Sequence, residues 1–299
     1  MPPGRGVDEK RRLRRNPRHD LSTGAADSSG MNRCRFLSSL VIRALAALAV
    51  FSTLDLAAPA RSAGLEGFGI VYLHGKGGWP GAFDGGILAS LEAEGAQVAK
   101  PDLPWSLKRK YGATYDEAMA EIDAVVAALK AKGASRIVVI GHSLGANAAI
   151  GYAARHPELA GVVVLVPGHL PETDELRGYT REAIAQAKEL IAAGQGNVPR
   201  GFPDVVQGIP LTATATPLVY LSMFDPDGPA VIPKNAQAMG PVPLLWVVGT
   251  LDPIARRGPD YAFNSAAKNP KSRYVEVFAG HLTTPLVARR RVVEWINSL

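Results

Sequence analysis

Cysteine is nearly absent from this chain of 299 residues, whose only thiol is that of Cys34. The rest of the chain therefore cannot use a cysteine nucleophile, and it cannot build a metal site from thiolate ligands. A body without thiols also suits an oxidising compartment, although cysteine usage alone does not assign one.

Excess charge is also missing from most of the chain. Of the formal net charge of +6, residues 1–60 carry +5, from ten Lys/Arg and five Asp/Glu. The other 239 residues hold 23 Lys/Arg and 22 Asp/Glu, which leaves a net charge of +1. A nearly neutral body has no electrostatic attraction for a phosphate backbone, so we expect no nucleic-acid partner.

A long apolar run occurs once, near the N-terminus. Residues 1–30 are rich in Arg, Pro and Ser without apolar periodicity, which predicts a disordered leader or an over-extended start of translation. Residues 31–60 begin with Met and a short basic segment, continue with a largely apolar run and end in Ala-Pro-Ala. This pattern is typical of a signal peptide, so we expect a periplasmic or secreted protein.

An uncleaved membrane anchor is the alternative interpretation of the same run. Arg43 and Asp55 interrupt it, and it is short for a membrane span. Cys34 precedes the apolar run, which argues against lipidation. We therefore expect contact with a membrane only through the export signal, and the sequence does not indicate an oligomeric state.

Residues 61–299 alternate between short apolar strands and helical patterns, at a length that suits one domain with a sizeable core. Strands are expected at 68–73, 97–103, 137–140, 159–166, 243–248 and 274–278. Helices are expected at 82–94, after a capping box at 114–117, after 145, near 259–268 and from 284 onwards. This order predicts an α/β fold with a doubly wound, mostly parallel sheet of about six strands and helices on both faces.

One connection, residues 168–242, is far longer than a normal link between a strand and the next element. It contains a helical pattern for which Thr180 is the predicted N-cap, and an apolar centre at 218–224. The segment is too apolar for a disordered linker. We interpret it as a cap inserted over the edge of the sheet.

The most informative stretch is Gly141-His142-Ser143-Leu144-Gly145, which joins the strand at 137–140 to an Ala-rich helix. The pattern G-x-S-x-G between a strand and a helix is typical of a nucleophile elbow. Gly141 and Gly145 carry no Cβ, so the strand and the helix can approach each other closely. A tight turn with an incidental serine is the alternative, and we predict that Ser143 is the nucleophile.

A serine hydroxyl needs a base that accepts its proton and a carboxylate that orients the base. Asp252 follows the strand at 243–248, and His281 follows the strand at 274–278. The carboxyl ends of parallel strands meet at one edge of a sheet, so we expect both side chains close to Ser143. The order Ser, Asp, His along the chain is that of a known type of catalytic triad.

Other interpretations of these two residues remain open. Asp252 precedes a proline and could begin an ordinary turn. Its rivals as the acid are Asp225, Asp227 and Asp260. His281 could be a surface histidine at a strand end, but the other histidines lie in the leader, at a helix end, at the start of the cap or in the two glycine motifs.

Residues 74–78, with the sequence His-Gly-Lys-Gly-Gly, follow the first strand and are called the oxyanion loop below. Their glycines let backbone N–H groups turn towards a developing negative charge. We predict that the amides of Lys76, Gly77 and Leu144 form the oxyanion hole, while the Lys76 side chain is solvated. The side chains expected to bind substrate are Trp79, His142 and Phe224.

Residues 68–299 resemble the α/β-hydrolase superfamily through the HGxGG loop, the GHSLG elbow, GTLDP at 249–253 and Gly-His at 280–281. The resemblance implies a serine esterase or lipase-like domain at 61–299 with the cap at 168–242. It also implies hydrolysis of a small-molecule carboxylic ester, thioester or amide through an acyl-enzyme, with no cofactor and no metal. An acyltransferase on the same triad and a non-catalytic binding protein are the alternatives. The chain begins at the family's third strand, so we expect the first antiparallel hairpin to be missing.

Overall fold

The computed structural model describes residues 64–299. The expected leader, the expected signal peptide and the alternative membrane anchor lie outside the described residues. Within residues 64–299, the structure contains no helix with the length and apolar character needed to span a bilayer.

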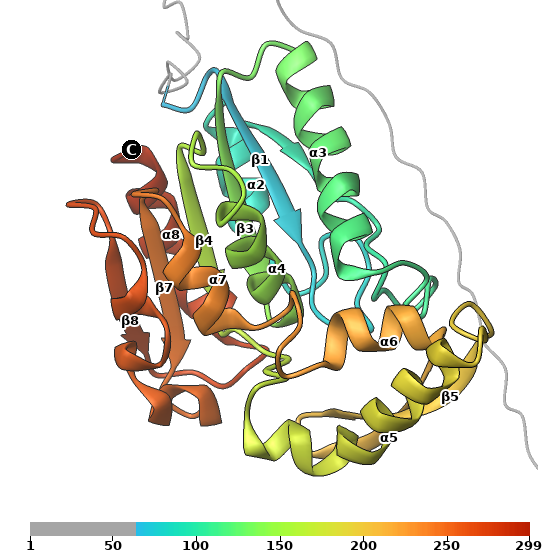
Figure 1. The fold of residues 1–299 in the computed structure, drawn as a ribbon. Coiled ribbons are helices and arrows are strands. Elements are labelled where there is room, and N and C mark those ends of the chain that lie inside the picture. Colours follow the sequence, from blue (N-terminus) through green and yellow to red (C-terminus); the bar gives the residue numbers. More distant parts are fainter. Residues whose placement is uncertain (1–63) are drawn as a thin grey trace, which may run out of the picture. The chain divides into compact units, whose positions relative to one another are not determined.

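Six parallel strands form the central sheet, in the order β2-β1-β3-β4-β7-β8 (Figure 1). The strands are β1 (Phe68–Leu73), β2 (Gln97–Ala99), β3 (Arg136–His142), β4 (Gly161–Leu165), β7 (Leu244–Gly249) and β8 (Arg273–Val277). β2 lies on one side of β1, and β3 lies on the other. The connections that leave the carboxyl ends of β1 and β3 therefore run in opposite directions, and a crevice lies between them. The predicted doubly wound, parallel sheet is confirmed.

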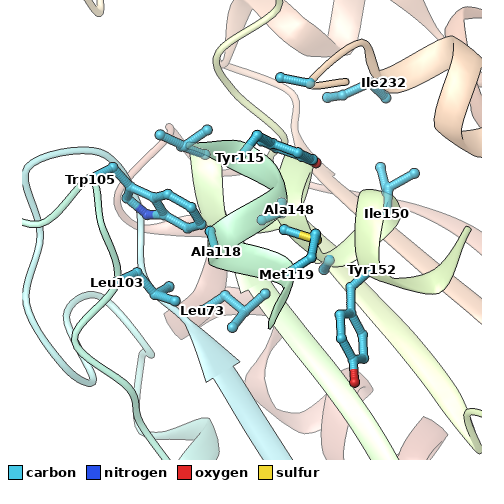
Figure 2. Packing of buried hydrophobic residues seen from close by; sticks show 14 of the residues in the cluster. Leu73, Leu103, Trp105, Tyr115, Ala118, Met119, Ala148, Ile150, Tyr152 and Ile232 are labelled. Carbon is cyan, nitrogen blue, oxygen red and sulfur yellow. The ribbon is translucent and has the colours of Figure 1, made fainter. Parts of the chain in front are cut away.

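Helices cover both faces of this sheet. On one face α3 (Tyr115–Ala131), α4 (Leu144–Ala153) and α7 (Ile232–Ala238) share a buried apolar cluster, part of which Figure 2 shows. On the other face α2 (Ile87–Ala93) and α8 (Thr284–Asn297) share a second cluster. All ten residues of α4 are buried, and apart from Asn147 and Tyr152 they are apolar residues or glycine.

The predicted capping box at the start of α3 is present. The Glu117 N–H donates to the Thr114 hydroxyl at 3.2 Å, and the Thr114 N–H donates to the Glu117 carboxylate at 2.7 Å. Both groups would otherwise be unpaired at the first turn of the helix. The box fixes where α3 begins, and α3 shares a buried cluster with Leu103 and Trp105, which both form hydrogen bonds with His74 of the oxyanion loop.

The long insertion holds α5 (Asp174–Ala192), the antiparallel hairpin of β5 (Arg200–Val206) and β6 (Ile209–Ala215), then α6 (Pro217–Phe224) and α7. Figure 1 shows α5, α6 and β5 beyond the end of the sheet towards which the β1 arrow points. The hairpin turns at Gln207 and Gly208, whose φ angles of 50° and 78° suit a two-residue turn. This hairpin brings the end of β5 to the crevice.

Three local predictions are wrong. Thr173 precedes α5, whereas Thr180 lies inside the helix and its hydroxyl donates to the Leu176 carbonyl. Residues 259–268 contain short 3₁₀ turns in place of the expected α-helix. Gly258, at φ 63°, and Pro259 do not allow a regular helix to continue through this segment. The second strand ends at Ala99, ahead of two prolines that cannot donate to a sheet.

Candidate active site

Ser143 sits in a strained turn between β3 and α4, with φ 58° and ψ −120°. A Cβ atom at Gly141 would lie 2.0 Å from the Gly145 carbonyl oxygen, and one at Gly145 would lie 2.0 Å from the Leu73 carbonyl oxygen. Only glycine fits at either position. The surrounding close packing holds the serine in a conformation that non-glycine residues rarely adopt.

The hydroxyl of Ser143 contacts His281, with 2.9 Å between Oγ and Nε2. The other ring nitrogen of His281, Nδ1, lies 2.5 Å from Oδ2 of Asp252. A carboxylate only accepts, so Nδ1 carries the proton and Nε2 presents a lone pair to the serine hydroxyl. The predicted nucleophile, base and acid therefore form one hydrogen-bonded chain.

Two loops hold the acid and the base together. The N–H groups of Thr250 and Leu251, after β7, donate to the carbonyls of Val277, the last residue of β8, and Ala279 beyond it, at 2.8 and 3.0 Å. The second oxygen of Asp252 accepts the Ile254 N–H at 2.8 Å. Two of the three rival acids are engaged elsewhere, since Asp225 pairs with Lys188 and Asp260 accepts from Asn264.

Two backbone amides beside Ser143 have no acceptor among the described residues. They belong to Lys76, in the oxyanion loop, and Leu144, at the first position of α4, and both residues line a cavity with Ser143. The prediction for Gly77 is corrected, because its N–H donates to the Trp105 carbonyl at 2.8 Å. The turn of the loop directs that amide towards the 103–107 segment, away from the serine.

His74 sets the direction of the Lys76 amide. The Leu103 N–H donates to Nε2 of His74 at 3.2 Å, so Nδ1 carries the proton and donates to the Gly75 carbonyl at 2.9 Å. In a trans peptide the N–H points opposite to the carbonyl, so the Lys76 N–H faces away from His74. Burial lowers the pKa of His74 and favours this neutral ring.

The cavity beside Ser143 has a volume of about 110 Å³. Its walls come from the oxyanion loop, from Phe83 and Leu282, and from Val205, Val206 and Gln207 at the tip of the cap hairpin. A larger hollow of about 700 Å³ adjoins it and shares Gly168, His169, Val205, Gln207 and His281. The hairpin tip therefore bounds both spaces next to the serine.

The three expected substrate-binding side chains have different positions. His142 lines the cavity, while Trp79 is 56% exposed and reaches it only through Phe83, 5.8 Å away between ring centroids. Phe224 is fully buried and stacks on Tyr220 at 4.3 Å, inside the cap. The expected contact of Phe224 with substrate is corrected, because α6 turns this ring towards the cap interior.

The side chain of Lys76 is not solvated as expected. Its Nζ pairs with Asp204 of β5, and the two side chains are only 10% and 4% exposed. No sequence signal connects these residues, which are 128 positions apart. The only local signal of the hairpin tip is Gly208, and Gln207 before it is not a usual residue of a two-residue turn.

Acidification should destabilise the protein between about pH 6.5 and pH 4. Burial lowers the pKa of His142 from 6.5 to about 4. The unfolded chain therefore binds a proton in this window that the folded state does not, and the free energy of unfolding falls as the pH falls. A shift of this size corresponds to at most about 3–4 kcal/mol.

Denaturant unfolding at pH 7 and pH 4.5 tests this linkage. Nε2 of His142 donates to the His281 carbonyl at 3.1 Å, and His142→Gln retains an amide donor without a titratable group. The variant should lose less stability on acidification than the wild type. Equal losses in the two proteins would contradict the assignment to His142.

Comparisons with known proteins agree with this architecture. The sequence profile of the alpha/beta hydrolase family matches residues 70–295. No curated protein matches the chain.

Several solved structures share the fold. A monoacylglycerol lipase from Paleococcus ferrophilus is 24% identical, with 77% of this chain and 94% of that chain covered and a TM-score of 0.58. The alpha/beta hydrolase GrgF from Penicillium sp. sh18 is 15% identical, with coverages of 80% and 92% and a TM-score of 0.59. Est1E from Butyrivibrio proteoclasticus, bound to ferulic acid, is 17% identical, with coverages of 77% and 88% and a TM-score of 0.56. The family profile spans both the sheet and the cap, and the chain belongs to the alpha/beta hydrolase family.

Proposed function

We propose that the protein is a serine hydrolase that cleaves a carboxylic ester through an acyl-enzyme. The observation that carries this proposal is the hydrogen-bonded chain from Ser143 through His281 to Asp252, beside two backbone amides that find no acceptor within residues 64–299. A serine deprotonated by a neighbouring imidazole attacks a carbonyl carbon, and amides placed at the carbonyl oxygen stabilise the charge that develops there.

In the first half of the reaction, Nε2 of His281 accepts the proton of Ser143 as Oγ bonds to the ester carbon. The carbonyl oxygen becomes negative and accepts hydrogen bonds from the amides of Lys76 and Leu144. Asp252 stabilises the imidazolium that forms. When the tetrahedral intermediate collapses, the alkoxide leaves with the proton of His281, and the acyl group remains on Ser143.

In the second half, a water molecule takes the place of the alcohol. His281 accepts a proton from this water as its oxygen attacks the acyl carbon. The same two amides stabilise the second oxyanion, and the proton returns to Oγ of Ser143 when the acid leaves. The proposed function thus needs only groups of this chain and water.

The smaller cavity is the proposed acyl site. It is bounded by both amides and has apolar walls from Phe83, Val206 and Leu282. The larger hollow, which shares His281, then receives the alcohol portion, since the leaving oxygen must approach Nε2. The limited volume beside Ser143 favours a short acyl chain.

Enlarging the cavity from the hairpin should lengthen the preferred acyl chain. Val206→Ala removes two methyl groups from the wall, and one methylene in such a pocket is worth about 1–3 kcal/mol of discrimination. The ratio of kcat/KM for p-nitrophenyl hexanoate over butyrate should therefore rise about fivefold or more. The rate of fluorophosphonate labelling should stay within about tenfold of wild type.

Phe224→Ala is the matched control for this experiment. It leaves a cavity inside the cap and should lower stability by about 3 kcal/mol without changing chain preference. A shift of preference in Phe224→Ala but not in Val206→Ala would place the acyl site elsewhere.

Ester turnover by purified residues 61–299 separates this proposal from its two alternatives. A hydrolase releases p-nitrophenol and free acid from p-nitrophenyl butyrate in plain buffer. An acyltransferase passes the acyl group to an added alcohol or amine in preference to water. A non-catalytic binding protein releases no p-nitrophenol, and that result would reject the proposed function.

A further inference from the structure

The side chain of Lys76 connects the oxyanion loop to the cap. Its Nζ lies 2.5 Å from Oδ1 of Asp204 and 3.2 Å from the carbonyl oxygen of Val205, both in β5. It also lies 5.4 Å from the centre of the Phe224 ring. The backbone amide of Lys76 thus faces the catalytic cavity, while the end of its side chain is held by the cap.

Asp204 is fully engaged in this contact. Its Oδ2 accepts the Tyr111 hydroxyl at 3.0 Å, and its Oδ1 accepts the Val205 N–H at 2.7 Å as well as the ammonium. A buried ion pair adds little net stability, because removing both charges from water offsets their attraction. The main effect of this ion pair is therefore on the geometry of the two segments that it joins.

The peptide groups on either side of Lys76 are fixed independently. The Gly75 carbonyl accepts hydrogen bonds from His74 and from the Gly78 N–H, and the Gly77 N–H donates to the Trp105 carbonyl. These hydrogen bonds set the orientation of the two peptide planes that share the Lys76 Cα. They do not tie the oxyanion loop to the cap, and the contact of Nζ with Asp204 supplies that link.

We propose that Asp204 is a positioning residue for catalysis. Through Nζ of Lys76 it holds the Lys76 N–H at the place where the oxyanion forms, and the same contact keeps the hairpin tip over Ser143. This inference rests on the proposed hydrolase function. It makes the cap part of the catalytic geometry as well as a cover for the site.

Removing the carboxylate should therefore slow catalysis. Asp204→Asn leaves a buried ammonium without a counter-charge, so Lys76 moves towards water and carries its amide away from the oxyanion. A displacement of about 1 Å in a positioning contact costs on the order of 10²-fold in rate. We expect kcat of Asp204→Asn to fall by about 10–100-fold, with KM within about threefold of wild type.

A transition-state analogue separates positioning from a structural role. Oγ of Ser143 adds to the carbonyl carbon of a trifluoromethyl ketone with a butyl chain, and His281 accepts the serine proton. The former carbonyl oxygen then carries the negative charge and lies in the oxyanion hole. The inhibition constant should rise by the same factor by which kcat/KM falls. A structural role would lower the melting temperature while the folded fraction keeps normal kcat and inhibition.

Asp225→Asn is the matched control. Asp225 also pairs with a lysine of the cap, Lys188, at 2.9 Å, but it does not line the cavity. This variant should leave kcat and the inhibition constant within about twofold of wild type.

A second variant covers the case in which Asp204→Asn does not fold. Tyr111→Phe removes one hydrogen bond to Asp204 and should give a parallel loss of about three- to tenfold in both measurements. Wild-type kcat and inhibition in the folded variant would overturn the inference. If wild-type protein turns over no ester and is not labelled by a fluorophosphonate, the proposed function itself fails, and this inference with it.

Discussion

Ser143→Ala, His281→Ala and Asp252→Asn should each reduce ester turnover by about 10³-fold or more, with little loss of stability. The first variant removes the attacking oxygen, and the second removes the imidazole that contacts it and would accept its proton. In Asp252→Asn the amide can donate to the ring, which favours the wrong tautomer of His281. Steady-state rates with p-nitrophenyl butyrate, beside circular dichroism, measure both effects.

The combined variants test whether the three residues act as one unit. They share a single hydrogen-bonded chain, so double variants should be scarcely slower than single ones. Asp260→Asn, which alters a rival acid near the same loop, is the control and should keep normal turnover. Strictly multiplicative losses, or normal turnover in Asp252→Asn, would contradict the assignment.

Gly145→Ala should strongly destabilise the protein, although it adds only one methyl group. The new Cβ would lie 2.0 Å from the carbonyl oxygen of Leu73, and it would join the buried backbone of α4 to that of β1 without room for contact. Neither element can move without opening the sheet, so we expect a loss of about 4 kcal/mol or more. That is a large part of the stability of an ordinary domain, about 5–15 kcal/mol.

Gly178→Ala provides the matched substitution in an open position. Gly178 lies within α5, and a Cβ added there would meet no atom within 4 Å, so the change should stabilise the protein by about 0.4–1 kcal/mol. Denaturant unfolding of the two variants measures the difference. A Gly145→Ala protein within about 1 kcal/mol of wild type would show that the elbow is not tightly packed.

The parallel sheet could be predicted because its strands are buried on both faces and read as continuous apolar runs. The first strand has the predicted bounds, 68–73, and the strands that lead to Ser143, Asp252 and His281 are all present. The meeting of these three side chains follows from parallel strands, whose carboxyl ends lie at one edge. Sequence order and sheet topology were sufficient for that part of the site.

The cap could not be predicted in the same way. Its hairpin depends on a turn at Gln207 that needs a positive φ, which is unusual for glutamine. The pairing of Lys76 with Asp204 joins residues from different modules, and neither residue shows a pattern that identifies its partner. Phe224 is a large apolar residue of the kind expected in an acyl pocket, but the packing of α6 decides which way its ring faces.

The central claim is that Ser143 is an activated nucleophile, and covalent labelling tests it most directly. Purified residues 61–299 are treated with a fluorophosphonate, and the adduct is located by intact mass and peptide mapping. We predict one adduct per chain, on Ser143, that is absent after unfolding in denaturant and absent in Ser143→Ala. Labelling at another residue, or no labelling of the folded protein, would contradict the claim.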